Sequence, residues 1–137
     1  MPILDGVLET ALYVDDLKRS IQFYQDIFRL EVLAGDDRFC AFNVVGRQVL
    51  LLFRKGGTTA RVATPGGAIP PHDGSGHLHF AFSIPTSELP AWEKWLQENG
   101  VEVESKVRWP EGGLSLYLRD PDGHLVELAT PGLWSIY

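Results

Sequence analysis

The sequence predicts an α+β fold in which one βαβββ module occurs twice. Residues 7–54 have the pattern of a strand, a helix and three strands, and residues 77–130 repeat that order. A segment rich in glycine, proline and threonine at 55–76 separates the two modules and has little to bury. The length of 137 residues suits one ordinary domain. We therefore expect a single domain whose curved mixed sheets enclose a cavity, followed by a tail at 131–137.

The elements of the first module follow from the spacing of its apolar residues. Alternation predicts a strand over 7–14, and apolar residues three or four positions apart predict a helix over 17–29. Asp15 and Asp16 precede this helix, where a carboxylate accepts hydrogen bonds from the free N–H groups of the first turn. The three remaining strands of this module are predicted over 31–35, 38–45 and 48–54.

The second module shows the same order. A strand is predicted over 77–84 and a helix over 87–99, with Thr86 or Ser87 as its cap. Asn99, followed by a glycine, is a typical helix end. The last three strands are predicted over 101–107, 114–119 and 124–130.

Each predicted sheet has one apolar face and one face that mixes polar with apolar side chains. Alternate residues of a strand point to opposite faces, and this parity places Glu9, His79 and Glu127 away from the helices. A bare carboxylate in a partly closed cavity costs on the order of several kcal/mol, so it needs a proton, a cationic side chain or a metal ion. The other polar or aromatic candidates for this face, expected to bind substrate, are Tyr13, His77, Ser115, Tyr117 and Arg119.

Composition excludes several classes of function. Twelve basic and 18 acidic residues give a net charge of −6 with no basic patch, which argues against a nucleic-acid partner. The longest apolar run, 49–53, is too short to span a membrane, and the N-terminus lacks the pattern of a signal peptide. The single cysteine, Cys40, cannot form an internal disulfide. We therefore expect a cytoplasmic protein.

Three stretches resemble the vicinal oxygen chelate superfamily, which includes glyoxalase I, fosfomycin-modifying thiol transferases, extradiol dioxygenases and bleomycin-binding proteins. Residues 8–17 (LETALYVDDL) resemble its first strand and helix cap, and residues 76–82 (GHLHFAF) resemble its fifth strand. Residues 115–128 (SLYLRDPDGHLVEL) resemble its last hairpin, which is the most specific of the three. Together with the βαβββ order, the resemblance covers nearly the whole chain.

The resemblance implies one divalent metal ion held by Glu9, His79 and Glu127, the residues that parity also selects. Two carboxylates and one neutral imidazole suit manganese, iron, cobalt, nickel or zinc. Some members of the superfamily have a fourth ligand, a glutamate on the fourth strand. Matching Gly46 to Gly123 places Leu50 at that position, and its neighbours cannot coordinate a metal either. Three ligands leave positions for water or substrate, as in catalytic sites.

The expected function is that of a metal-dependent lyase or isomerase of the glyoxalase type, acting on a small substrate with vicinal oxygens. Glu9 and Glu127 are also its acid–base candidates, because a ligand carboxylate can leave the metal to take a proton. The alternatives are a thiol transferase or dioxygenase on the same scaffold, or a metal-free binding protein that confers drug resistance. In this superfamily the cavity often forms across two chains, so we expect a homodimer.

Several residues have more than one interpretation. The acidic cavity is either a metal site or a vestigial cavity closed by Arg119 or by protonation. Arg119 itself either clamps an anionic group of the substrate or pairs with Glu127 or a surface acid. His77 supports the site, replaces a ligand or lies at an edge. His72 belongs either to a lid or to an exposed loop. Trp109 is expected near the mouth of the cavity.

Overall fold

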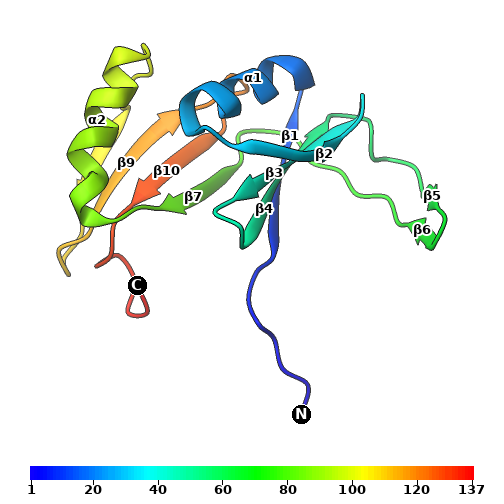
Figure 1. Ribbon diagram of the computed structural model, residues 1–137, viewed down its shortest axis with the longest axis horizontal. Helices are drawn as coiled ribbons and strands as arrows, with labels where there is room; N and C mark the ends of the chain where they lie inside the picture. Colours follow the sequence, from blue (N-terminus) through cyan, green and yellow to red (C-terminus); the bar gives the residue numbers. More distant parts are fainter. The chain divides into compact units, whose positions relative to one another are not determined.

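The chain contains two four-stranded sheets of identical topology, and a computed structural model describes it over residues 1–137 (Figure 1). Residues 1–76 form one compact unit, unit 1, and residues 77–137 form the other, unit 2. The elements of unit 1 are β1 (Glu9–Val14), α1 (Leu17–Phe28), β2 (Glu31–Gly35), β3 (Phe39–Val44), β4 (Gln48–Arg54), β5 (Val62–Thr64) and β6 (Gly67–Ile69). Those of unit 2 are β7 (His79–Ser83), the 3₁₀ turn η1 (Thr86–Glu88), α2 (Leu89–Glu98), β8 (Ser105–Arg108), β9 (Leu114–Arg119) and β10 (Leu125–Ala129).

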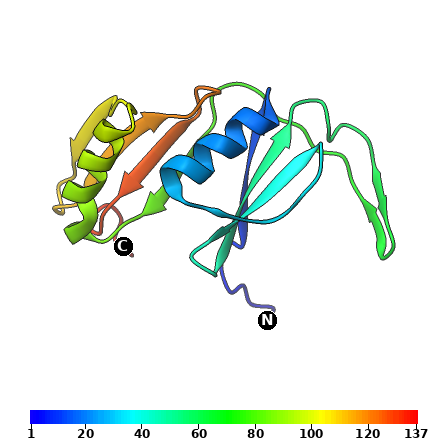
Figure 2. The same cartoon turned by 45° about the horizontal axis from the view of Figure 1, so that its top comes forward.

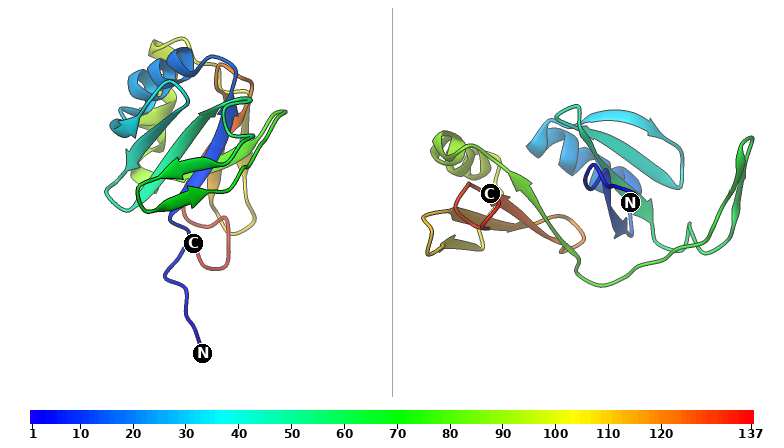
Figure 3. Two further views of the ribbon diagram at one scale, coloured as in Figure 1. Left: turned by 90° about the vertical axis from the view of Figure 1, so that its right-hand side faces the viewer. Right: turned by 90° about the horizontal axis from the view of Figure 1, so that it is seen from below.

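The strand order repeats between the units. The main sheet of unit 1 has the order β1-β4-β3-β2, and the sheet of unit 2 has the order β7-β10-β9-β8. In each sheet the first strand pairs in parallel with the last, and the other pairings are antiparallel. One helix covers one face of each sheet (Figure 3). The predicted α+β fold of two βαβββ modules is thus observed.

In unit 1 the helix packs on the apolar face that parity predicts. The Asp16 side chain caps α1 by accepting a 3.1 Å hydrogen bond from the backbone N–H of Arg19. Tyr24, from the helix, and Phe42, from β3, are both fully buried, with ring centroids 6.2 Å apart. The strand residues buried on this face are Leu12, Val14, Cys40, Phe42, Leu50 and Leu52. Alternation therefore assigns the two faces of this sheet correctly.

Alanine substitutions of two neighbouring leucines should distinguish the buried face of β4 from its cavity face. Leu52 is fully buried against the helix, whereas Leu51 points to the other face and borders a cavity. We expect Leu52→Ala to lower the free energy of unfolding by about 2–5 kcal/mol, as for other fully buried leucines. Leu51→Ala should cost clearly less, because the cavity already leaves part of that side chain without packing partners. Urea unfolding of both variants measures the difference; equal losses would contradict the assignment of faces.

Helix α2 begins differently from the prediction. Neither Thr86 nor Ser87 caps it, because both lie in the 3₁₀ turn η1 and no side chain caps the helix. Pro90, in the first turn, lacks an N–H, so one backbone donor fewer needs a partner there. The helix ends at Glu98 with Asn99 as its C-cap, within one residue of the predicted end, and the next glycine adopts φ +69°. The core of this unit contains Leu96, Leu116, Leu118, Val126 and Leu128.

The segment 55–76 contains a feature that the sequence analysis missed. Strands β5 and β6 pair as a short hairpin over Val62–Thr64 and Gly67–Ile69. Figure 2 shows this hairpin between two extended connections, one that comes from β4 and one that leads to β7. Only three residues pair on each side, too few for a periodic pattern to indicate strands. The other clear difference is β8, which starts at Ser105 instead of residue 101.

The aromatic and sulfur side chains divide unevenly between the units. All four tryptophans, at 92, 95, 109 and 134, belong to unit 2. The only thiol, Cys40, lies on β3 of unit 1 and is 1% exposed. Burial raises the pKa of this thiol to about 11. Cys40 is therefore a packed and unreactive core residue.

None of the helices is both long enough and apolar enough to cross a membrane.

Candidate metal centre

Unit 2 brings together two of the three predicted metal ligands. His79 begins β7 and Glu127 lies on the neighbouring strand β10, with His79 Nε2 3.4 Å from Glu127 Oε1. The other ring nitrogen, Nδ1, lies 2.9 Å from the Leu125 carbonyl oxygen. A carbonyl only accepts, so Nδ1 carries a proton, and in the neutral imidazole Nε2 presents its lone pair to the carboxylate. Hydrogen bonding of Nδ1 to a backbone carbonyl is a frequent arrangement for histidine metal ligands.

The carboxylate of Glu127 is buried and held from its other side. Its side chain is only 6% exposed, whereas that of His79 is 50% exposed. Ser115 donates its hydroxyl to Glu127 Oε2 at 2.5 Å, and Trp109 Nε1 donates to Ser115 Oγ at 2.8 Å. Burial and the Glu127 charge raise the pKa of the neighbouring Tyr117 phenol, which therefore keeps its proton. Glu127 thus has one oxygen fixed by Ser115 and one directed toward His79.

The gap between His79 and Glu127 suits either a proton or a metal ion. Two donor atoms that bind a transition metal at about 2.0–2.2 Å, at tetrahedral or octahedral angles, lie about 2.8–3.6 Å apart. The observed 3.4 Å separation fits this range. Without an ion, the same pair is an imidazolium–carboxylate ion pair if His79 is protonated. The two side chains therefore fit a divalent ion that takes nitrogen and oxygen ligands.

Removing the Ser115 hydroxyl should weaken metal binding without abolishing it. Ser115→Ala frees Glu127 Oε2 and breaks the contact with Trp109, so the carboxylate loses its fixed orientation. Outer-shell partners of metal ligands typically contribute about 10–100-fold to affinity, and we expect a loss of that size. Titration of the metal-free protein with Mn²⁺, followed by electron paramagnetic resonance, measures it. Ser105→Ala, on the edge strand β8, is the matched control, and equal affinities for all three proteins would contradict the prediction.

The third predicted ligand, Glu9, occupies the equivalent position in unit 1. Glu9 begins β1 and pairs with Val49, as His79 begins β7 and pairs with Leu125. Glu9 is exposed and borders a cavity. Neither unit alone groups three histidine, cysteine, aspartate or glutamate side chains that could hold a metal ion. Glu9 and the His79–Glu127 pair therefore belong to different units.

Strand register corrects the position of the absent fourth ligand. In unit 2, Glu127 pairs with Ala81, two residues after His79. The matching pair in unit 1 is Leu51 with Ala11, two residues after Glu9. Leu51, and not Leu50, is thus the counterpart of Glu127, and the glycine matching was wrong by one residue. Leu50 is buried on the helix face. The conclusion that the chain offers no fourth ligand is unchanged, since the counterpart is a leucine.

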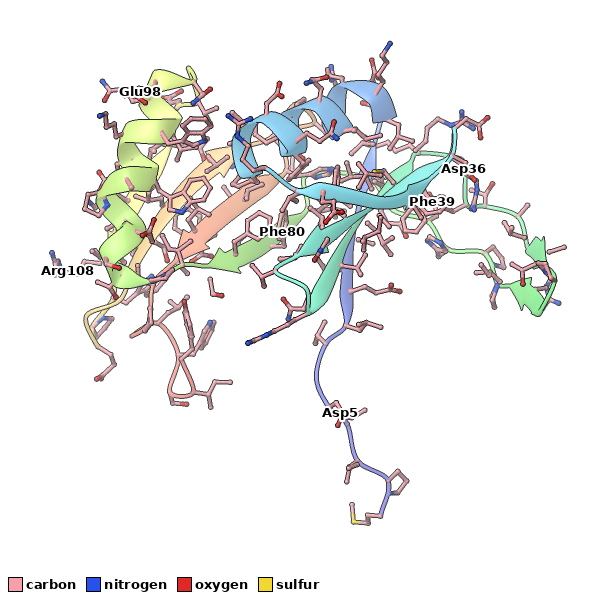
Figure 4. All side chains as sticks on the ribbon, viewed as in Figure 1. Asp5, Asp36, Phe39, Phe80, Glu98 and Arg108 are labelled. Atoms are coloured by element: carbon pink, nitrogen blue, oxygen red, sulfur yellow. The ribbon has the colours of Figure 1, made fainter.

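A cavity of about 670 Å³ lies on the inner face of the unit 1 sheet, within the size range of small-molecule sites. Its apolar lining comes from the strands and the hairpin, and Glu9 and Arg38 are the charged groups at its border. Phe39 lies on β3, as labelled in Figure 4. The apolar side chains around the cavity are Ala11, Phe39, Leu51, Phe53, Val62 and Ile69.

Most of the remaining predicted site residues lie away from the Glu127 carboxylate. Arg119 pairs with the surface acid Glu104 at 3.2 Å and donates to the Gly123 carbonyl oxygen, so it does not neutralise Glu127. His77 precedes β7, and its ring lies against the backbone of Gly123. Tyr13 belongs to unit 1, where its hydroxyl lies 2.5 Å from His72 Nδ1. Of the predicted substrate-binding residues, only Ser115 and Tyr117 lie directly beside Glu127.

One residue at the unit 1 cavity was underrated by the sequence analysis. His72 is half-buried and borders the cavity, whereas the default expectation was an exposed loop residue. It lies outside any strand or helix, so no periodicity indicates its direction. The only local signal is the Pro70-Pro71 pair before it, which restricts the backbone.

Comparisons with known proteins agree with this architecture. The model of the Glyoxalase/Bleomycin resistance protein/Dioxygenase superfamily matches residues 6–128. A metallothiol transferase FosB from Staphylococcus saprophyticus is 33% identical over 130 residues, covering 93% of this chain and 78% of that protein. A FosB from Bacillus licheniformis is 34% identical over 126 residues, covering 91% and 75% of the two chains.

Two solved structures are also similar. A lactoylglutathione lyase from Agrobacterium tumefaciens is 36% identical, with a TM-score of 0.87 over 96% of this chain and 98% of that one. A mutant of FosX, a fosfomycin resistance protein from Listeria monocytogenes, is 25% identical, with a TM-score of 0.65 over 92% and 90% of the chains. That structure contains Mn(II) and 1S,2S-dihydroxypropylphosphonic acid. The comparisons confirm the predicted resemblance and the predicted class of metal-dependent enzymes.

Proposed function

Because this chain belongs to the Glyoxalase/Bleomycin resistance protein/Dioxygenase superfamily, we propose that it binds one divalent metal ion through His79, Glu127 and Glu9 and acts on a small substrate with adjacent oxygen atoms. The convergence of His79 Nε2 and Glu127 Oε1 carries this proposal. Two lone-pair donors face each other there, with Nδ1 and Oε2 already engaged by Leu125 and Ser115. A metal-free drug-binding protein does not require two ligand atoms that face each other in this way.

Thiol transfer is the reaction that the curated relatives favour. Both FosB proteins are named metallothiol transferases, and they share about a third of their aligned residues with this chain. A lyase or isomerase is the second candidate, because the lactoylglutathione lyase structure is 36% identical over nearly the whole chain. In either case the bound ion would act as a Lewis acid that stabilises negative charge on a substrate oxygen.

Within this proposal, the residues around the metal have different roles. Glu9 is exposed at a cavity, so it is the better placed of the two glutamates to exchange a proton with a substrate. Glu127 is buried and fixed by Ser115, which suits a constant ligand. Ser115 and Tyr117 orient that ligand. Manganese is the first metal to test, since the FosX structure contains it.

We further propose a homodimer in the cytoplasm. Neither unit alone groups three ligands, and the inner face of unit 2 leaves Ala81 and Ser83 exposed beside His79. The apolar cavity of unit 1 and the His79–Glu127 pair of unit 2 would each supply one part of the proposed site. A dimer that joins unit 1 of one protomer to unit 2 of its partner would complete two such sites by symmetry.

The direct test uses untagged protein prepared without chelators. We expect near one equivalent of a divalent metal per chain by elemental mass spectrometry. The Mn²⁺-loaded protein should consume thiol in the presence of fosfomycin, or convert a glutathione hemithioacetal to lactoylglutathione. Thiol consumption supports the transferase, and lactoylglutathione formation supports the lyase. Failure to bind any of the five predicted metals would exclude the proposed function.

A further inference from the structure

His72 is held more rigidly than a residue of an irregular loop needs to be. Its backbone N–H donates to the Thr58 carbonyl oxygen at 3.0 Å, and the Thr58 hydroxyl donates to the His72 carbonyl oxygen at 2.5 Å. Thr58 is itself 1% exposed, so both bonds are anchored to a buried residue. The loop therefore presents this imidazole from a fixed point of unit 1.

The ring of His72 is fixed as well. Tyr13 Oη lies 2.5 Å from Nδ1, and the Phe53 ring makes an edge contact with centroids 4.6 Å apart. Gly74 packs on the Tyr13 ring, where any Cβ would overlap ring atoms. A polar contact and an aromatic contact thus set the ring orientation, and a glycine leaves room for the tyrosine that makes the polar one.

The Tyr13 contact favours one of the two neutral tautomers of the His72 ring. Burial, with a smaller effect of the Asp73 charge, raises the pKa of the Tyr13 phenol. The phenol therefore keeps its proton and can donate it to Nδ1. In a neutral imidazole that accepts at Nδ1, the hydrogen is on Nε2. The ring then has one N–H donor left to offer.

His72 lines the cavity of unit 1, whereas Tyr13, whose hydroxyl engages Nδ1 of His72, does not. We propose that His72, oriented by Tyr13, is a ligand-binding residue that donates its Nε2–H to an oxygen atom of the bound molecule. The apolar part of that molecule, of the size of an aromatic ring, lies against Phe39, Leu51 and Phe53. The inference rests on the proposed function only in that the cavity borders Glu9.

The tautomer provides a test that needs no ligand. His72 is the only histidine of unit 1, and its signals are identified by their loss in His72→Gln. Long-range proton–nitrogen correlation should show the Nε2–H tautomer in the natural protein. In Tyr13→Phe this preference should be lost, so that both neutral tautomers of His72 are present. A ring protonated only at Nδ1 in the natural protein would overturn the proposal.

Ligand binding tests the role itself, with 1-naphthoate as a probe that joins an aromatic surface to an acceptor oxygen. Binding to the metal-free protein is followed through the His72 ring signals and by calorimetry. His72→Leu should weaken binding about tenfold, the effect of one hydrogen bond to a charged group. His72→Gln should retain most of the affinity, because its amide N–H replaces Nε2–H.

Two outcomes would overturn the ligand role: no response of His72 to the probe, or equal affinities for the natural protein and His72→Leu. Tyr13→Phe provides a second variant with a smaller change in volume. Protein that binds Mn²⁺ but not the probe would overturn this inference alone. Protein that binds the probe but no metal would overturn the proposed enzyme and leave the inference standing.

Discussion

Glu127→Gln should abolish metal binding while leaving the fold intact. The amide keeps the size of the side chain and can still accept a hydrogen bond from Ser115 at its oxygen. It lacks the negative charge of the carboxylate. It also lacks the second carboxylate oxygen, Oε1, whose lone pairs face His79 Nε2 across 3.4 Å. We expect the metal content to fall from near one equivalent per chain to the background level. The loss of affinity should exceed the roughly 10–100-fold effect of an outer-shell partner.

A matched carboxylate separates this effect from a general loss of charge. Glu104 is an exposed acid of the same unit, paired with Arg119 at 3.2 Å. Glu104→Gln removes the same charge away from His79, and its metal content should equal that of the natural protein. Thermal unfolding of both variants checks that they fold. Retention of a full equivalent of metal by Glu127→Gln would show that the ion binds elsewhere.

A mixture of two inactive variants should recover metal binding if the site forms across protomers. Glu9→Gln and Glu127→Gln each remove one ligand, so neither homodimer has an intact site. In a mixed dimer, one site combines both substitutions and the other combines the natural Glu9 of one chain with the natural His79 and Glu127 of its partner. Random exchange of subunits should therefore restore about a quarter of all sites.

The measurement is the metal content of the mixture after subunit exchange under mild denaturant. The unmixed variants, treated in the same way, give the baseline. A site built within one chain would stay at the baseline in the mixture, because every chain lacks a ligand. A monomer by light scattering would likewise reject the arrangement across chains.

Parity along the strands was enough to predict that His79 and Glu127 lie on the same face, where their side chains meet. The alternation of Leu116, Leu118, Val126 and Leu128 fixes one face of β9 and β10 as core, and Glu127 falls on the other face. His79 follows in the same way from the phenylalanines at 80 and 82 on β7 (Phe80 is labelled in Figure 4). Burial of one face determines the register of a strand, so these predictions depended only on local sequence.

The features that sequence reasoning missed depend on contacts between distant segments. The partner of Arg119 is Glu104, 15 residues away on a neighbouring strand connection, and no spacing rule selects it over Glu127. The contact of His72 with Tyr13 spans 59 residues. The shift from Leu50 to Leu51 arose because the turns before β4 and β10 place their strands differently, although both contain a glycine with positive φ. Each of these features becomes visible only when the contacting residues or the paired strands are known.

The uneven distribution of tryptophan and cysteine gives each unit its own reporter of unfolding. Tryptophan fluorescence follows unit 2, and the rate at which a disulfide reagent labels Cys40 follows the opening of unit 1. An ion that binds Glu9 together with His79 and Glu127 stabilises both units, since ligand binding shifts every folding equilibrium that it is linked to. We therefore expect Mn²⁺ to slow Cys40 labelling and to raise the denaturant midpoint of the fluorescence change. If Mn²⁺ raises only the fluorescence midpoint, unit 1 contributes no ligand. The metal then does not couple the unfolding of the two units.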